Sequence, residues 1–293
     1  MGSNGNIRVN GNEVFLRVGR DWYHYDASQR PLGAGAMGTV YLGRNCQDSH
    51  DLVAIKQVNP AYASLQPIRD RARLEASLAF RHRNLVEMIG CCEDGNLRGP
   101  MFIISRLVQG VTIDRYVNRT FANRDDRVER IIKCIFPVLD ALDYIHSKGI
   151  IHLDIKPSNI MVENGSNIRL MDLGIAYTHA HPGMTASGLL GTPGYAAPEQ
   201  YIQPGQTTLP FDATTDIYQL GATLYELISG VKPYQNDPDK LDPIPGVAKW
   251  IMKVIAKSLA PEQTGRYSSA RQFRTALNEA ILYKPKFWER LFK

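Results

Sequence analysis

Cysteine is scarce in the sequence, and the few cysteines present are not spaced to bind zinc. The 293 residues include four, Cys46, Cys91, Cys92 and Cys134, and no two of them form a C-x-x-C pair. Two adjacent cysteines cannot both be terminal ligands of an ordinary zinc knuckle. We therefore expect reduced thiols in a cytoplasmic protein.

Long apolar runs are also missing. No run reaches the roughly 18 residues that cross a membrane, and the first residues lack the apolar core of a signal peptide. Asn6 lies where a myristoylation signal needs Ser or Thr. We expect a cytoplasmic localisation, with membrane contact only through the tail at 284–293 or through a membrane tether beyond Lys293. For the aromatic and basic tail itself, a docked strut is favoured over a membrane-surface segment or the start of a juxtamembrane region.

An excess of charge of one sign is absent as well. The net charge is +5, from 34 basic and 29 acidic residues. Nucleic-acid-binding domains usually have a concentrated basic face, so we expect no nucleic-acid partner, whereas a polyanionic small ligand such as a nucleotide is compatible. The length and the ordinary hydrophobic content predict a soluble globular chain of about two domains.

One polar stretch organises the rest of the chain. Residues 151–159 read IHLDIKPSN, between a helix pattern and a strand pattern. Asp154, Lys156 and Asn159 supply a carboxylate to position a hydroxyl, a cation to neutralise a moving phosphoryl group, and a neutral oxygen ligand for a metal. By itself such a trio is more often a polar surface turn, so the interpretation depends on the other motifs.

A glycine loop precedes this stretch. Gly33, Gly35, Gly38 and Val40 form the pattern G-x-G-x-x-G-x-V. The glycine spacing alone is weak because dinucleotide-binding folds share it. Those folds open a helix at this point, whereas residues 39–42 are typical of a strand. The loop therefore predicts a hairpin whose backbone amides approach phosphate oxygens, since glycine has no Cβ to block them.

Three further motifs follow. Lys56 ends a strand pattern that reads VAIK, and Glu75 comes 19 positions later (75 − 56) in a predicted helix over 69–80. Asp172 follows another strand pattern, 18 positions after Asp154 (172 − 154). The sequence GTPGYAAPE then ends at Glu199.

In this order and spacing the motifs resemble those of Hanks-type (eukaryotic-like) protein Ser/Thr kinases, most of all the bacterial ones. Lys156 in the catalytic loop and Thr192 before A-P-E are marks of the Ser/Thr type. Two residues depart from the family pattern: Leu153 replaces the Arg of H-R-D, and Leu173 replaces the Phe of D-F-G. The resemblance covers about residues 30–282.

The fold implied by the resemblance is α+β and two-lobed, with an antiparallel β-rich N-lobe that has one main helix and a mainly α-helical C-lobe. The expected boundaries are an N-terminal extension at 1–28, the N-lobe with its hinge at 29–109, the C-lobe at 110–283 and the tail at 284–293. Alternation of Val14, Leu16 and Val18 predicts a short strand in the extension. Apolar spacing predicts long helices over 128–145, 216–229, 247–259 and 268–282.

The chemistry implied is transfer of the γ-phosphoryl group of MgATP to a Ser or Thr hydroxyl of a protein substrate. Asp154 would orient the hydroxyl and accept its proton, a role worth roughly 10²–10⁴-fold in rate. Lys156 would stabilise the transferring group. Asn159 and Asp172 would hold Mg²⁺ (or Mn²⁺) against the nucleotide.

The resemblance also places an ATP site. Lys56, fixed by Glu75, would align the phosphates. Val40, Ala54 and Met161 would sandwich the adenine, although simple core packing explains these three equally well. The full set assigned to ATP is Leu32, Gly33, Gly35, Gly38, Val40, Ala54, Lys56, Ser105, Arg106, Leu107, Val108, Met161 and Asp172.

Within that set, residues 105–108 would form the hinge between the lobes. Ser105 falls at the gatekeeper position, and Leu107 and Val108 would face the adenine. Arg106 replaces the acidic residue that many kinases carry there.

The activation segment is expected at 175–199. In kinases that have it, the arginine replaced here by Leu153 grips a phosphate on this segment. Because leucine cannot do so, we predict that activity depends little on loop phosphorylation. The segment's named residues are the candidate autophosphorylation sites Thr178, Thr185 and Ser187, together with Thr192, Glu199 and the pair His179 and His181, which is interpreted as solvated loop rather than a metal site.

Three residues are assigned structural roles. His152 is interpreted as a packing and hydrogen-bonding strut. Asp216 would hold the backbone of the catalytic loop, and Arg266 would pair with Glu199. Losing one partner of that buried pair should cost roughly 3–5 kcal/mol.

The rival class is a pseudokinase that binds ATP as a regulatory or scaffold module. Only Leu153 and Leu173 support it. A small-molecule kinase is disfavoured because such enzymes usually lack a full activation segment and A-P-E.

Overall fold

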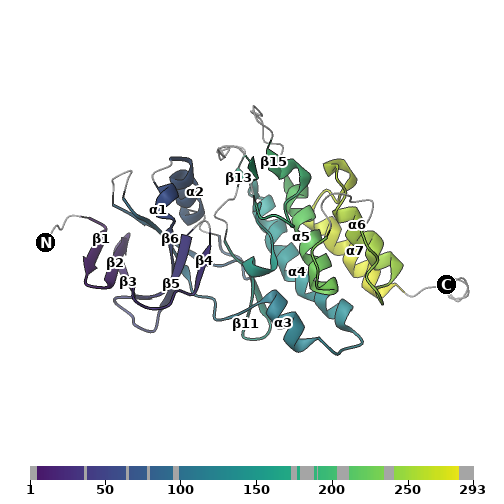
Figure 1. The fold of residues 1–293 in the computed structure, drawn as a ribbon, viewed down its shortest axis with the longest axis horizontal. Coiled ribbons are helices and arrows are strands. Elements are labelled where there is room, and N and C mark those ends of the chain that lie inside the picture. The colour runs from purple at the N-terminus through teal and green to yellow at the C-terminus, as the bar shows by residue number, and fades with distance from the viewer. Residues whose placement is uncertain are drawn as a thin grey trace, which may run out of the picture.

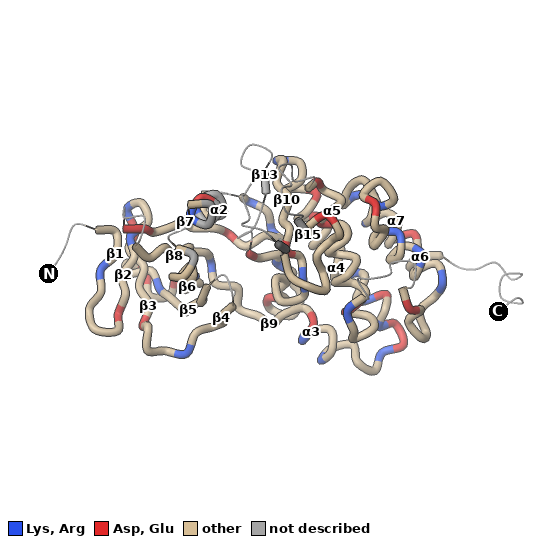
Figure 2. The backbone as a smooth tube through the Cα atoms, turned by 45° about the horizontal axis from the view of Figure 1, so that its top comes forward, with Lys and Arg blue, Asp and Glu red and all other residues tan. Residues whose placement is uncertain are grey.

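The computed structural model describes residues 5–35, 38–63, 66–77, 80–94, 99–172, 177–178, 188–189, 191–202, 211–233 and 241–283. Its strand-rich N-lobe and its helical C-lobe lie side by side along the long axis of the molecule (Figure 1). Basic and acidic residues are interspersed over both lobes (Figure 2). The two-lobed α+β fold expected from the sequence is confirmed.

An antiparallel sheet forms the N-lobe. Its strand order is β1-β2-β3-β5-β6-β8-β7, with β4 paired to β5. The strands are β1 Ile7–Asn10, β2 Glu13–Val18, β3 Asp21–Asp26, β4 Gly33–Gly35, β5 Gly38–Asn45, β6 Leu52–Val58, β7 Met88–Glu93 and β8 Met101–Arg106. Alternating side chains in β6 and β8 bury one apolar face against β2 and β3, and the other against the helices described next.

The first strands belong to this same sheet. The predicted strand over 14–18 is β2, but β1 and β3 flank it, and β3 pairs with β5. Tyr23 and Tyr25 of β3 point inward and are buried with the apolar face of β6 and β8. A Cβ at Gly90 of β7 would lie 2.5 Å from Cγ1 of Val18, so only glycine permits this close approach of β2. Residues 7–26 of the extension are therefore part of the N-lobe sheet.

Two helices cover the other side of the sheet. They are α1 Pro60–Ala63 and α2 Gln66–Ser77, and α2 packs against β7 and β8. Arg69 of α2 is buried and donates to the carbonyl oxygens of Ala63 (2.7 Å) and Gly99 (3.0 Å). The helix predicted over 69–80 is present as α2, but it begins earlier, at Gln66, and its last residue is Ser77.

Helices build the C-lobe: α3 Ile113–Thr120, α4 Arg127–His146, α5 Ala213–Ser229, α6 Lys249–Ser258 and α7 Ala270–Leu282. Their apolar faces form one core around α4 and α5. Asp212 caps the start of α5 by accepting from the backbone of Thr214, and Gly230 ends it in the left-handed conformation (φ 82°). No helix among the described residues is long and apolar enough to cross a membrane.

The C-lobe also contains several short paired strands. β9 Gly110–Thr112, β11 Ile160–Glu163 and β12 Asn167–Leu170 form a three-stranded sheet. β10 Ile150–Ile151 pairs with β13 Tyr177–Thr178, and β14 Gly188–Leu189 pairs with β15 Tyr201–Ile202. The catalytic-loop motif lies between α4 and β11, the helix and the strand that its flanking patterns predict, but the two-residue strand β10 at its start was not predicted. The tail at 284–293 lies outside the described residues.

Candidate active site

A cavity of about 730 Å³ separates the two lobes. Every residue that the sequence assigns to the ATP site lines it, as do Asp154, Lys156, Asn159 and Thr192. Sequence reasoning missed several other lining residues, Val86, Met88, Ile103, Thr112, Ser158 and Met171. The motifs are far apart in the chain, and the fold brings them to one place.

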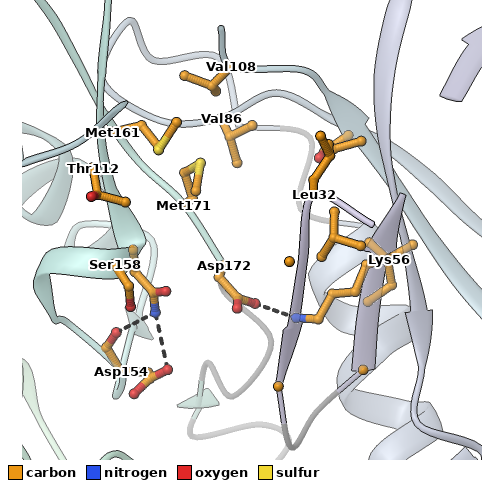
Figure 3. A pocket seen from close by; sticks show the side chains of 18 of the residues that line it. Leu32, Lys56, Val86, Val108, Thr112, Asp154, Ser158, Met161, Met171 and Asp172 are labelled. Atoms are coloured by element: carbon orange, nitrogen blue, oxygen red, sulfur yellow. Dashed lines mark hydrogen bonds and ion pairs between the residues drawn. The ribbon is translucent and has the colours of Figure 1, made fainter. Parts of the chain in front are cut away.

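The cavity has an apolar end and a polar end. Val86, Val108, Met161 and Met171 gather at one end, while Asp154 lies at the other (Figure 3). An apolar slot beside a few convergent polar groups is the usual form of a cofactor site. It suits a flat base at one end and its phosphates at the other.

Arg106, in the segment expected to be the hinge, forms its ion pairs and its backbone hydrogen bond with nearby residues of the N-lobe. The Arg106 guanidinium forms an ion pair with Asp51, and its Nε lies 3.7 Å from Glu87. Its backbone N–H donates to the Glu87 carbonyl at 2.9 Å. An arginine here therefore joins the end of β8 to the residues that directly precede β6 and β7.

Lys56 and Asp172 meet in the middle of the cavity. The Lys56 ammonium lies 2.5 Å from Oδ1 of Asp172 (Figure 3). Burial raises the pKa of the Asp172 carboxyl, but the neighbouring Lys56 cation, together with His152 and Lys156, more than offsets this and holds the pKa below its usual value. Asp172 is therefore ionised at neutral pH.

Glu75, the other expected partner of Lys56, lies on α2, but its side chain is outside what the structure describes. The Lys56–Glu75 pair stays a prediction. Leu173 is likewise outside the described residues.

Two non-glycine residues at the motifs have left-handed backbone, Leu153 (φ 66°) and Asp172 (φ 61°). Such strained positions are typical of functional sites.

A hydrogen-bonded network surrounds Asp154. The Lys156 ammonium donates to Oδ2 of Asp154 at 2.7 Å and to the Thr192 hydroxyl at 2.7 Å. The Thr192 hydroxyl donates to Oδ1 of Asp154 at 2.6 Å. The carboxylate, the cation and the Thr192 hydroxyl thus form a closed triangle, which holds the end of the activation segment on the catalytic loop.

Asn159 and Asp172 supply donors that suit magnesium. The Asn159 amide nitrogen donates to the carbonyl oxygen of Asp154 (2.8 Å) and to its Oδ2 (3.1 Å). Its amide oxygen is therefore the group left to bind a metal, and the Asp172 carboxylate lines the same cavity. Mg²⁺ prefers such oxygen ligands and completes its shell with substrate phosphates and water. In the part of the chain that the structure describes, no three His, Cys, Asp or Glu side chains form a metal cluster.

Asp216 of α5 binds the backbone of the catalytic loop through its carboxylate. Its Oδ2 accepts from the backbone N–H of His152, and its Oδ1 accepts from that of Leu153, both at 2.9 Å. His146 Nε2 lies 2.7 Å from Oδ2 of Asp216. His152 itself is fully buried, with Nε2 3.0 Å from the Met171 carbonyl oxygen. This is the geometry expected of a strut.

Arg266 and Glu199 form the predicted pair. The guanidinium donates to both carboxylate oxygens, at 2.7 and 2.8 Å. The Arg266 side chain is 0% exposed and lies 4.9 Å from the centre of the Tyr218 ring. Thr215 Oγ1 also donates to Glu199 at 2.8 Å.

The sequence analysis did not identify several other contacts near the site. The Tyr195 hydroxyl donates to the Glu226 carboxylate, and Lys232 Nζ lies 4.7 Å from the centre of the Tyr195 ring. Burial first, and then the Glu226 carboxylate, raise the pKa of Tyr195, so it stays protonated. Gln200 and Gln219 bond to the catalytic loop and are fully buried. The polar glutamine within the apolar 216–229 pattern was the one available signal.

The activation segment is described only in part. Thr178 lies in β13, which pairs with β10. Thr185 and Ser187 lie outside the described residues, as does the His179 and His181 pair.

Comparison with known families agrees with this geometry. A model of the protein kinase domain matches residues 27–280. The chain belongs to the protein kinase family. Its two-lobed fold and its motif order are those of the family.

Several bacterial kinases are similar to this protein kinase. Serine/threonine-protein kinase PknB of Mycolicibacterium smegmatis is 32% identical over 268 residues, which cover 84% of this chain and 41% of that protein. Serine/threonine-protein kinase PknJ of Mycobacterium tuberculosis is 32% identical over 279 residues, covering 86% of this chain and 45% of that protein. The chain thus spans less than half the length of these relatives.

Proposed function

We propose that this chain transfers the γ-phosphoryl group of MgATP to Ser or Thr hydroxyls of proteins. The observation that carries the proposal is the closed triangle of Asp154, Lys156 and Thr192 at the polar end of the cavity. A carboxylate and a cation this close can act on one incoming hydroxyl. The two relatives described above are both named Ser/Thr-protein kinases, and this supports the same substrate class.

The residues divide the reaction between them. An acceptor hydroxyl bonds to Asp154, which takes its proton as the new O–P bond forms and the bond to the β-phosphate breaks, releasing ADP. Lys156 neutralises charge on the moving group. Lys56 aligns the nucleotide phosphates, and Asn159 and Asp172 hold Mg²⁺. The metal supplies charge neutralisation at the phosphates when bound.

Local contacts make each group ready for its role. Lys156 is about one-fifth exposed, so its charge is only partly screened. The Asn159 amide fixes the peptide and the carboxylate of Asp154 together. Such preorganisation, rather than covalent chemistry, is the main catalytic device in phosphoryl transfer.

A pseudokinase remains the second candidate because of Leu153 and Leu173. Against it, Lys56, Asp154 and Asp172 all line one cavity. Autophosphorylation within 178–187 is part of the proposal, as is a cytoplasmic site of action.

Substitution of Asp154 by Asn tests the proposal. With MgATP and a generic Ser/Thr protein substrate, we expect phosphoserine or phosphothreonine from the parent, and a rate lower by roughly 10²–10⁴-fold in Asp154→Asn. The matched control is Asp143→Asn, the same chemical change at a surface residue of α4 paired with Arg271. The control should keep the parent rate.

The outcome for nucleotide binding separates the two candidates. If the parent binds MgATP but forms no phosphorylated product, the chain is a nucleotide-binding module and the kinase proposal fails. Binding of MgATP by Asp154→Asn should persist, because the apolar end of the cavity is unchanged.

A further inference from the structure

Two buried glutamine side chains reach the catalytic loop. Gln219 lies on α5, and Gln200 lies in the 3-10 turn Pro198–Gln200 that ends the A-P-E motif. Both are 0% exposed. Buried amides must find hydrogen-bond partners, and the partners of these two identify what they hold.

Gln219 grips the backbone on both sides of Asp154. Its Oε1 accepts from the N–H of Ile155 at 2.9 Å, and its Nε2 donates to the carbonyl oxygen of Leu153 at 2.8 Å. One side chain thus fixes the peptide groups before and after Asp154. This pairing restricts the direction in which the Asp154 carboxylate can point.

Gln200 completes the arrangement from the activation segment. Its Nε2 donates to the Leu153 carbonyl at 2.9 Å, and its Oε1 accepts from Gln219 Nε2 and from the Ala197 N–H, each at 2.8 Å. Gly191, next to Thr192, packs directly on it (φ 128°): a Cβ there would lie 2.9 Å from Gln200 Nε2 and 3.1 Å from the Leu153 oxygen. The segment that carries Thr192 therefore rests on the same two amides.

The contacts also account for the backbone of Leu153. Its left-handed conformation (φ 66°) is unfavourable for a branched apolar residue, and its side chain is fully buried. Two amide donors on its carbonyl and the Asp216 carboxylate on its N–H hold it there. All three contacts come from unmodified side chains of the C-lobe.

We propose that Gln200 and Gln219 form an amide clamp that positions Asp154 and Thr192 for phosphoryl transfer. The clamp keeps the loop ordered without a phosphorylated activation segment, which the uncharged Leu153 could not grip. Both residues are positioning residues, because among the described residues that line the cavity neither glutamine is present. The inference rests on the proposed function for its effect on rate.

Substitution of Gln219 by Met tests the clamp. Met keeps a similar volume and removes both bonds to the loop. We expect kcat to fall by up to about 100-fold, the loss that misplacing a reacting group by about 1 Å can cause. KM for MgATP should change little, because the nucleotide walls are untouched. Gln200→Met, which leaves Gln219 bonded to the loop, should cause a smaller loss and serves if Gln219→Met does not fold.

Tyr225→Phe is the matched control. Tyr225 lies on the same helix, is buried, and donates one hydrogen bond, to the Asp242 carbonyl at 3.2 Å. Its loss should lower stability without changing kcat. If Gln219→Met, like Tyr225→Phe, loses stability but keeps the kcat of the parent, the positioning role is refuted. The role is also refuted if kcat is unchanged without any loss of stability.

Hydrogen exchange provides a readout that does not need activity. The Ile155 amide should exchange faster in Gln219→Met than in the parent and in Tyr225→Phe. Unchanged exchange would overturn the clamp. A parent that transfers no phosphoryl group would refute the proposed function, while the exchange result would still decide whether the clamp orders the loop.

Discussion

Neutralising Glu199 tests the buried ion pair of the C-lobe. In Glu199→Gln the Arg266 guanidinium, 0% exposed, loses its only charged partner among the described residues. Breaking a buried pair from one side costs roughly 3–5 kcal/mol. Arg266 still donates to the carbonyl oxygens of Ala260, Pro261 and Thr214, at 2.8, 2.8 and 3.1 Å. These bonds place the expected loss near the lower end, about 3 kcal/mol.

Thermal unfolding followed by circular dichroism measures this loss. For a domain of this size, about 3 kcal/mol corresponds to a Tm lower by about 6 to 12 °C. The control is Arg271→Met, which breaks the exposed Arg271–Asp143 pair, 80% and 38% exposed. An exposed pair is worth about 0–1 kcal/mol, so the control should move Tm by a few degrees at most.

A double variant separates the pair from its surroundings. Glu199→Gln combined with Arg266→Met should lose less stability than the two single losses added, because no buried charge is left unpaired. If the single and double losses are additive, or if Glu199→Gln costs no more than Arg271→Met, the reasoning about this pair is wrong.

Two further predictions concern charges of the N-lobe and the cavity. Since Lys56 lowers the pKa of Asp172, their pair stabilises the fold above the usual pKa near 3.8 and loses this effect as pH falls below it. Urea unfolding from pH 7 to about pH 3 should therefore show Lys56→Met destabilised at neutral pH, with the deficit shrinking in acid; a constant deficit would contradict this. Glu93 of β7 binds Arg73 (2.8 and 3.0 Å) and the buried Arg69 (3.3 Å) of α2. Glu93→Gln should lower the free energy of unfolding by about 1–3 kcal/mol and speed amide hydrogen exchange in α2. Exchange in α2 at the parent rate would show that Glu93 does not hold α2 on β7.

The placement of the proposed catalytic residues could be predicted because their spacing is set within short segments. Asp154, Lys156 and Asn159 lie within six positions, and the loop between β10 and β11 leaves few ways to place them. Asp172 lies two positions after the end of β12, so the strand pattern indicated its position too. Local sequence was sufficient where one loop carries the chemistry.

Contacts between distant segments could not be predicted in this way. Gln219 and Gln200 meet Leu153 from 66 and 47 residues away. Gln219 stands out as a polar residue within an apolar helix pattern, but nothing local identifies its partner. The same holds for β3, whose mixed aromatic and charged residues show little alternation. Tyr23 and Tyr25 are buried only because β2 and β3 fold back over β6 and β8. Tertiary packing, rather than strand propensity, decides these elements.

The central claim is that this cleft transfers phosphoryl groups with an unphosphorylated activation segment. The most direct measurement is the initial rate of phosphoserine and phosphothreonine formation by phosphatase-treated protein, with MgATP and a generic substrate. The account predicts product from the first turnovers, without a lag. An inactive sample, or one that gains activity only after autophosphorylation, would contradict it.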